Sequence, residues 1–130
     1  MVDLASALTI SASAMEAQSQ RLARLSENIA NSDTPGYRRK TISFEQELDF
    51  GLPTGAIAAG PVQLDDSPLE QIYDPSNPLA DETGHYDGSN VNLLIEMADA
   101  REAQRSYEAN LKMFDQVRQT TSQLLELLRR

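Results

Sequence analysis

The sequence lacks cysteine and tryptophan, and it contains one histidine, His85. Without cysteine the chain has no disulfide, no thiolate metal site and no thiol nucleophile. One histidine is too few for a histidine metal cluster. Aromatic residues are also scarce, with three Phe and four Tyr, so we expect no aromatic-rich core. These absences predict a protein without a metal, a cofactor or a nucleophilic catalytic site.

Long hydrophobic runs are also missing. No apolar stretch approaches the roughly 18 residues that a membrane-spanning helix requires. The first basic residue is Arg21, so the start of the chain lacks the charged region of a secretory signal. We therefore expect synthesis in the cytoplasm without a cleaved signal peptide. The 20 acidic residues against 11 basic ones argue against nucleic acid and anionic lipid as partners.

Proline, glycine and positive charge are absent from particular segments. All six prolines and all six glycines lie between Pro35 and Gly88. Both ends of the chain are therefore free of the two residues that most disfavour helix. Residues 41–90 hold ten acidic residues and no Lys or Arg, whereas both ends are nearly neutral. The sequence predicts three segments: a helix over 1–34, an acidic insert over 35–90 and a helix over 91–130.

The N-terminal segment has the hydrophobic spacing of an amphipathic helix. Asp3 is the expected N-cap, and the helix should end near Asn31, after about 40 Å. A type II turn at Pro35-Gly36 should follow. The stripe alternates steps of four and three residues, with Ser11 and Gln18 as polar interruptions. It is either half of an ordinary helical hairpin core or a surface that meets other subunits. Its apolar members are Leu4, Leu8, Met15, Leu22, Leu25 and Ile29.

The C-terminal segment repeats this pattern over a longer stretch. Asn92 is the expected N-cap, and the helix should extend to about Leu128, roughly 55 Å. Gln104 and Arg118 interrupt its stripe. The members that we predict to pack against other subunits are Met97, Tyr107, Leu111, Phe114, Leu125 and Leu128.

The insert is predicted to be irregular, with short strands. The segments 41–45, 60–64 and 71–73 have strand-like composition. Asx-Pro dipeptides at Asp74 and Asn77 favour turns. We expect a small β-hairpin or an extended loop that packs on the helices.

The acidic residues of the insert do not form a recognisable site. Aligning Gly88 with the EF-hand glycine puts Thr83 and His85 at ligand positions, so the calcium pattern fails. Neighbouring carboxylates such as Asp65 and Asp66 could act as an acid and a base. A solvated acidic surface is the simpler interpretation, and no catalytic role is assigned to His85.

Together these segments predict a mainly α protein. The two long helices should form an antiparallel coiled-coil hairpin, with the small irregular or β insert between them. A pair of helices leaves the outer parts of both stripes exposed and supplies little core. We therefore expect a poorly stable monomer that packs against further helices.

Three blocks of sequence carry a family resemblance, and they occur in the family's order. They resemble the signature motifs of the bacterial flagellar rod and hook proteins, and in particular those of a proximal-rod subunit. The first block contains Asn28, Ile29, Ala30, Asn31, Thr34, Pro35, Gly36 and Tyr37, the second Tyr73, Asp74 and Pro75, and the third Asn90, Val91, Asn92, Tyr107, Glu108, Ala109 and Asn110.

The resemblance implies a structural role and no enzymatic one. Such proteins stack their terminal helices into the axial drive shaft of the flagellum, which transmits torque. The implied partners are copies of itself, sibling rod subunits and the flagellar type III export apparatus, and the implied location is the periplasmic rod of the basal body. The amides of Asn28 and Asn31 either bond between helices of different subunits or cap the helix end.

Three alternatives to this interpretation exist. One is a sibling rod subunit, because the compact Thr-Pro-Gly-Tyr form also occurs there. Another is a cytoplasmic helical adaptor or chaperone-like hairpin, and the third is an enzyme that uses the acidic insert. Presence of the protein in purified basal bodies would separate the rod subunit from the adaptor.

Overall fold

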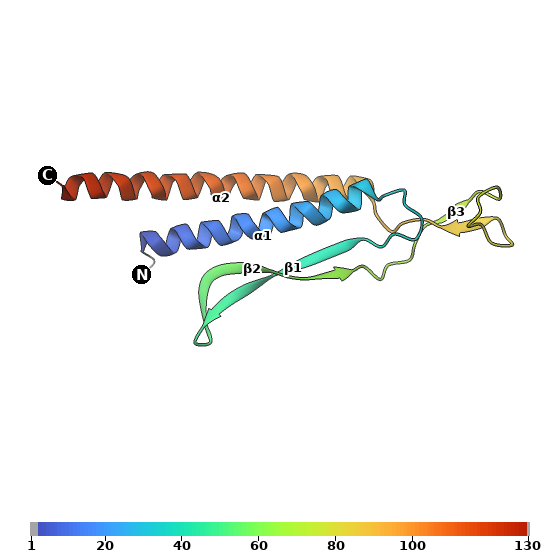
Figure 1. Ribbon diagram of the computed structural model, residues 1–130, viewed down its shortest axis with the longest axis horizontal. Coiled ribbons are helices and arrows are strands. Elements are labelled where there is room, and N and C mark those ends of the chain that lie inside the picture. Colours follow the sequence, from blue (N-terminus) through green and yellow to red (C-terminus); the bar gives the residue numbers. More distant parts are fainter. Residues whose placement is uncertain (1–2, 130) are drawn as a thin grey trace.

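The computed structural model describes residues 3–129 and has two long helices joined by two β-hairpins (Figure 1). Residues 1, 2 and 130, which belong to the predicted terminal segments, lie outside the described part. The elements are α1 (Leu4–Ala30), β1 (Lys40–Asp49), β2 (Leu52–Leu64), β3 (Gln71–Tyr73), β4 (His85–Asp87) and α2 (Leu93–Leu128). Two long helices with an antiparallel β insert confirm the coarse prediction.

Both helices begin at the predicted caps. The Asp3 carboxylate accepts from the backbone N–H of Ser6 at 2.6 Å. The Asn92 side chain accepts from the N–H groups of Leu94 and Ile95. These bonds satisfy N–H groups that have no partner inside the helix. The capping residues thus fix where each helix starts, as the sequence indicated.

The two helices lie side by side and run in opposite directions (Figure 1). The buried residues of α2 are Glu96 and Ala103, and those of α1 include Ser11 and Asn28. The inner faces are therefore small and polar. At 1.5 Å per residue α2 is about 54 Å long and α1 about 40 Å, so the C-terminal end of α2 extends past the start of α1.

Only part of the hydrophobic stripe predicted on α2 lies on the face that contacts α1. Tyr107 and Phe114 are half-buried, but several of the leucines and Met97 remain exposed. The reason is that Glu96 is drawn inward by polar partners, which turns its neighbour Met97 outward. The idea that the two helices share this whole stripe is wrong for the isolated chain.

The insert is more regular than predicted. The strands β1 and β2 form a long antiparallel hairpin, in register from Lys40–Leu64 to Asp49–Leu52, with two irregularities. The sequence predicted strands only at the open end of this hairpin, over 41–45 and 60–64, because Pro53 and Gly55 lie in the rest of β2. The hairpin packs along α1, where the Ile57 N–H donates to the Ser13 hydroxyl at 3.1 Å.

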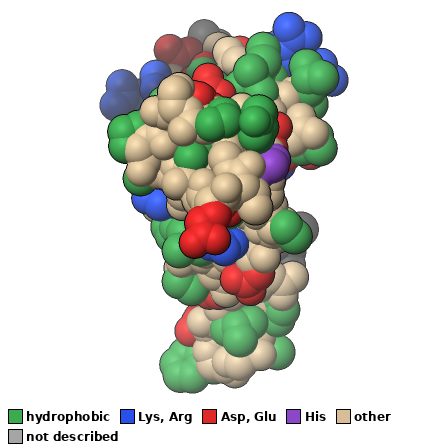
Figure 2. Space-filling model, turned by 90° about the vertical axis from the view of Figure 1, so that its right-hand side faces the viewer, with side chains coloured by type: hydrophobic (Ala, Val, Ile, Leu, Met, Phe, Trp, Pro, Cys, Tyr) green, Lys and Arg blue, Asp and Glu red, His purple; other side chains and the backbone are tan. Residues whose placement is uncertain are grey.

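A second, short hairpin lies beyond the end of the helix pair (Figure 1). It consists of β3 and β4, paired from Gln71–Asp87 to Tyr73–His85. Viewed from this end, the surface mixes acidic and other polar groups with separate hydrophobic side chains (Figure 2). No described helix is both long and apolar enough to cross a membrane.

The hydrophobic core is small. Among the described residues, the buried hydrophobic ones are Ala17, Leu25, Ala56 and Ala103. Three of these four are alanines, so little apolar area leaves water on folding. The helices and strands are therefore held together by their close approach rather than by the packing of large side chains.

We expect the dilute monomer to have less helix at 25 °C than the 27 and 36 residues of α1 and α2, and to melt broadly. The reason is that the small core offsets little of the conformational entropy lost on folding. Far-UV circular dichroism over a dilution series measures this. A sharp, cooperative transition from full helix content would contradict the prediction.

Candidate functional site

The candidate site is the junction where α1 ends, β1 begins and α2 starts. At its centre Asn28 is fully buried. Its amide donates to the Lys40 carbonyl at 2.9 Å and to Glu96 at 3.2 Å. Its carbonyl oxygen accepts from the Tyr37 hydroxyl at 2.8 Å and from the Lys40 N–H at 2.9 Å. One side chain therefore joins both helices and the first strand.

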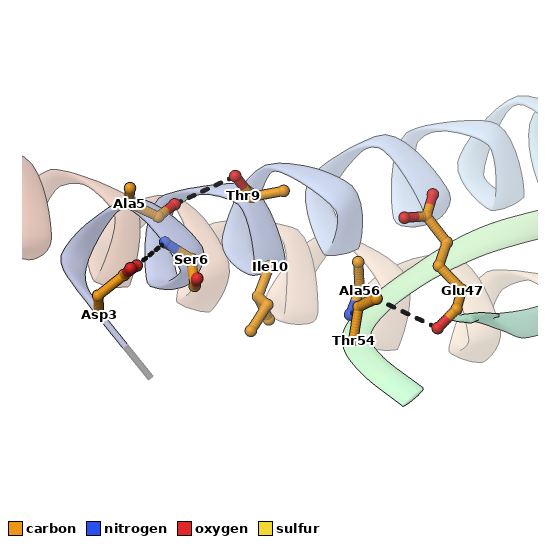
Figure 3. A pocket seen from close by; sticks show the side chains of 8 residues that line it. All are labelled: Asp3, Ala5, Ser6, Thr9, Ile10, Glu47, Thr54 and Ala56. Carbon is orange, nitrogen blue, oxygen red and sulfur yellow. Dashed lines mark hydrogen bonds between the residues drawn. The ribbon is translucent and has the colours of Figure 1, made fainter. Parts of the chain in front are cut away.

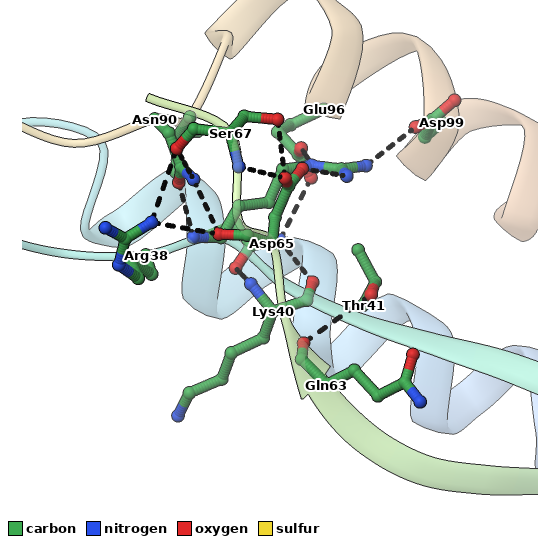
Figure 4. A network of polar contacts seen from close by, with 12 residues as sticks. Arg38, Lys40, Thr41, Gln63, Asp65, Ser67, Asn90, Glu96 and Asp99 are labelled. Atoms are coloured by element: carbon green, nitrogen blue, oxygen red, sulfur yellow. Dashed lines mark hydrogen bonds and ion pairs between the residues drawn. The ribbon is translucent and has the colours of Figure 1, made fainter. Parts of the chain in front are cut away.

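A charged cluster lies against this asparagine (Figure 4). The Arg39 guanidinium pairs with the fully buried Glu96 carboxylate. It also lies 3.4 Å from Asp65 and 3.7 Å from Asp99. Because an unpaired buried carboxylate is very costly, Arg39 is required for the burial of Glu96.

The cluster also includes Asp65, the first residue of the connection from β2 to β3. Asp65 accepts from the hydroxyl and the N–H of Ser67 at 2.6 and 2.8 Å. These two bonds, together with the Arg39 guanidinium, keep the pKa of Asp65 below its usual range. Asp65 is therefore ionised wherever an ordinary aspartate is, and it remains a partner for Arg39.

Asn90 closes the junction from the other side. Its side-chain carbonyl oxygen accepts from the backbone N–H of Arg39 at 2.6 Å. Its side-chain amide donates to the backbone carbonyls of Asp65 and Ser67 at 3.0 and 3.1 Å. The backbone N–H of Asn90 donates to the Tyr37 carbonyl at 3.4 Å. The first and third sequence blocks thus meet here.

The turn after α1 sets the direction of the chain. Asn31 donates to the Glu27 carbonyl at 2.9 Å, so this asparagine caps the helix end. The Tyr37 N–H donates to the Thr34 carbonyl at 3.2 Å, and Gly36 has a φ of 72°. This is the backbone expected of the predicted type II turn, in which the third residue is glycine.

The two asparagines of the first block therefore differ. Asn31 has the capping role that the sequence allowed. Asn28 has neither of the two roles proposed for it. Its burial keeps it from bonding to a neighbouring subunit, and its bonds reach beyond the helix end, so it is not a simple cap. It does join two helices, but both belong to the same chain.

The second block lies away from the junction. Tyr73 ends β3, and its ring lies 5.1 Å from that of His85, centre to centre. A Cβ on Gly84 would come within 2.8 Å of the Tyr73 ring, so only glycine fits there without movement. Asp74 and Pro75 follow in the turn. This block therefore shapes the short hairpin.

The rest of the third block has local roles or none that the structure shows. Asn92 caps α2, and Asn110 donates to the Ser106 carbonyl at 2.8 Å. Tyr107 is half-buried, whereas Glu108 and Ala109 are exposed. Of the apolar motif residues beside the junction, Ile29 and Val91 are half-buried and Ala30 is exposed.

The predicted packing residues divide by helix. On α1, Leu25 is buried, and its other predicted members are half-buried: Leu4, Leu8, Met15, Leu22 and Ile29. On α2, Leu111, Leu125 and Leu128 are exposed, by 41%, 56% and 82%. The stripe on α2 therefore has apolar surface without a partner within the described chain.

An open hollow of about 320 Å³ lies between the first turns of α1 and the long hairpin (Figure 3). Its two carboxylates are Asp3, which caps α1, and Glu47 of β1. Polar hydroxyls from Ser6, Thr9 and Thr54 complete it. Within residues 3–129, no cluster of three His, Asp or Glu side chains is placed to hold a metal ion.

Sequence reasoning missed the role of Arg39, Glu96 and Asp65. Arg39 and Glu96 lie inside or beside the blocks that carried the resemblance, but no periodic pattern indicates that a charged residue is buried.

Comparison with known proteins places this fold and junction in a class. The family model described as "Flagella basal body rod protein" matches residues 8–38. A second, described as "Flagellar basal body rod FlgEFG protein C-terminal", matches residues 82–127. The two matched segments contain α1 with its turn and α2 with its cap, so the class is that of the flagellar basal-body rod proteins.

Individual relatives identify the member of the class. The flagellar basal-body rod protein FlgC of Agrobacterium fabrum is 44% identical over 99% of this chain and 98% of its own length. The FlgC proteins of Salmonella typhimurium and Aquifex aeolicus are 34% and 38% identical, over 91% and 88% of this chain and 92% and 89% of their own lengths. The chain belongs to the FlgC family, which favours FlgC over its sibling FlgB.

Replacing Asn28 by alanine should lower the free energy of unfolding by about 2–4 kcal/mol, because it leaves several buried polar groups unpaired. The matched control is Asn31→Ala, which removes the bond to the Glu27 carbonyl and the exposed bond from the Thr34 hydroxyl and should cost about 1 kcal/mol. Urea unfolding in sucrose, which strengthens the folded state, measures both. Equal losses in the two variants would contradict a central role for Asn28.

Acid should weaken the junction through Asp65. A lowered pKa in the folded state means that its stabilisation is complete above the ordinary aspartate pKa of about 4. This stabilisation is lost as the pH falls through the folded value. Ser67→Ala removes the largest cause, so the pKa of Asp65 should rise, as followed by NMR titration of its carboxyl carbon. An unchanged pKa in this variant would refute the assignment.

Proposed function

We propose that this chain is a structural subunit of the flagellar basal-body rod, without enzymatic activity. The observation that carries the proposal is the distribution of apolar surface on α2. Its buried face holds Glu96 and Ala103, whereas Met97 and Leu111 face solvent. A helix with this arrangement has surface to bury against further helices.

In this proposal the helical segments 1–34 and 91–130 together form one axial packing domain, and the insert 35–90 lies beside it. The terminal helices pack as coiled coils with helices of neighbouring subunits. The half-buried stripe of α1 and the exposed stripe of α2 supply the contacts. Both helical segments are close to neutral, so stacked copies avoid repulsion between like charges.

The partners in this proposal are other copies of the chain and sibling rod subunits, which together form the drive shaft that transmits torque. The subunit reaches the periplasmic rod through the flagellar type III export apparatus, without a cleaved signal peptide. The names of the relatives, flagellar basal-body rod protein, support the location.

The packing surface is tested by Leu111→Asp. Because Leu111 is exposed in the chain, the new charge leaves the fold intact but blocks burial between subunits. We expect at least a tenfold loss of rods in purified basal bodies, with unchanged protein level. Gln119→Asp adds the same charge at an exposed polar position of α2 and is the control.

Motility on soft agar and electron microscopy of basal bodies give the readouts. Normal rods in the Leu111→Asp strain would remove this stripe from the packing surface. Phe114→Asp is a second variant for which we also expect a loss of assembly, but its side chain is half-buried, so it combines packing with folding.

A further inference from the structure

The tip of the long hairpin has an unusual turn. Asp49 and Leu52 are the last paired residues, so Phe50 and Gly51 alone form the turn. Both have positive φ, 51° for Phe50 and 79° for Gly51. Such turns favour Asn-Gly or Gly-Gly, because a side chain beyond Cβ is strained in the left-handed region. Local folding therefore disfavours phenylalanine at this position.

Phe50 is also fully exposed, at 100%, so burial within the chain does not compensate for the strain. Next to it Leu48 and Leu52 are exposed by 61% and 70%. The hairpin tip projects away from the helices (Figure 1). A strained and exposed aromatic residue between exposed leucines indicates a contact made outside the chain.

Carboxylates border this apolar tip along one of its two strands. Glu45, Glu47 and Asp49 lie on β1, and the insert has no Lys or Arg between residues 41 and 90. The tip is thus an apolar knob with an acidic border. A matching surface must be hollowed, apolar and basic at its edge.

The same chain presents such a surface at the other end of the hairpin. A hollow of about 310 Å³ lies between α1 and the hairpin, lined by Gln20, Ala23, Arg24, Ile42 and Val62. Its floor is apolar, and at its edge Arg24, which pairs with Glu27 at 3.2 Å, keeps 35% of its side chain exposed to a second carboxylate. The hollow near the start of α1 is the poorer match, because its charged side chains are the carboxylates of Asp3 and Glu47.

The two surfaces cannot meet within one chain. Ile42 and Phe50 are eight residues apart on β1, which is about 26 Å of extended strand. Any contact between tip and hollow therefore joins two molecules. Because the two surfaces differ, each molecule uses its tip on one neighbour and its hollow on another, which gives a ring or an open helical assembly according to the rotation between copies.

We propose that the Phe50 tip of one copy inserts into the Ala23–Ile42–Val62 hollow of a neighbouring copy, with Glu47 and Asp49 beside its Arg24. This inference rests on the proposed function, since it needs copies that stack. It goes further by assigning one specific contact between copies to the insert, separate from the helical packing.

Disulfide crosslinking tests the contact directly, because the chain has no cysteine. A strain carrying Asp49→Cys with Ala23→Cys, which keeps the Phe50 ring, should give crosslinked dimers and higher species in oxidised basal bodies, since a disulfide needs Cα atoms within about 7 Å. The control pairs Asp49→Cys with Ala12→Cys, at an exposed position of α1, and should give none.

The outcomes separate this inference from the proposed function. Presence of the cysteine chain in basal bodies without the 49–23 crosslink overturns the inference and leaves the rod role standing. Crosslinks of Asp49→Cys only to a protein of different mass overturn it too. Absence of the unaltered chain from basal bodies refutes the rod role itself.

A second variant covers the case in which the double cysteine chain fails to assemble. Phe50→Asn suits the left-handed backbone and removes the aromatic ring, so the isolated chain should keep its helix content and melting temperature. We expect at least a tenfold drop in rods per cell, whereas Phe50→Tyr should retain most of them. Normal rod numbers with Phe50→Asn would overturn the proposal.

Discussion

The structure depends on the burial of one carboxylate, Glu96, at the start of α2. Buried charge is stable only when it is paired and hydrogen-bonded, and here Arg39 and Asn28 supply these partners. Both partners come from the other half of the chain, before and after the turn that ends α1. The requirement to satisfy Glu96 therefore fixes how the helices and the long hairpin meet.

This polar junction explains why the apolar residues of α2 are outside. The helix face that meets the rest of the chain is determined by Glu96 and the small Ala103. The face with Met97 and Leu111 then turns to solvent. The buried polar groups of α2 are used within the fold of the chain, and its apolar surface remains exposed. The net negative charge lies mainly in the segment of the two hairpins.

Sequence reasoning was most successful where short-range physics decides the outcome. The caps at Asp3 and Asn92 and the Pro35–Gly36 turn follow from local hydrogen bonds and backbone preference, and they were predicted. The long hairpin was underestimated because Pro53 and Gly55 argue against a strand, while its support comes from α1. The Arg39–Glu96 pair joins residues 57 positions apart, and no local pattern indicates such a partner.

The unequal helix lengths have a geometric consequence. The C-terminal end of α2 extends past the start of α1, so the end of the helix pair is stepped rather than flat (Figure 1). In the proposed stack of copies, stepped ends do not meet flush, and each copy lies partly alongside the next. That overlap spreads twisting load along the sides of the helices instead of concentrating it at their ends.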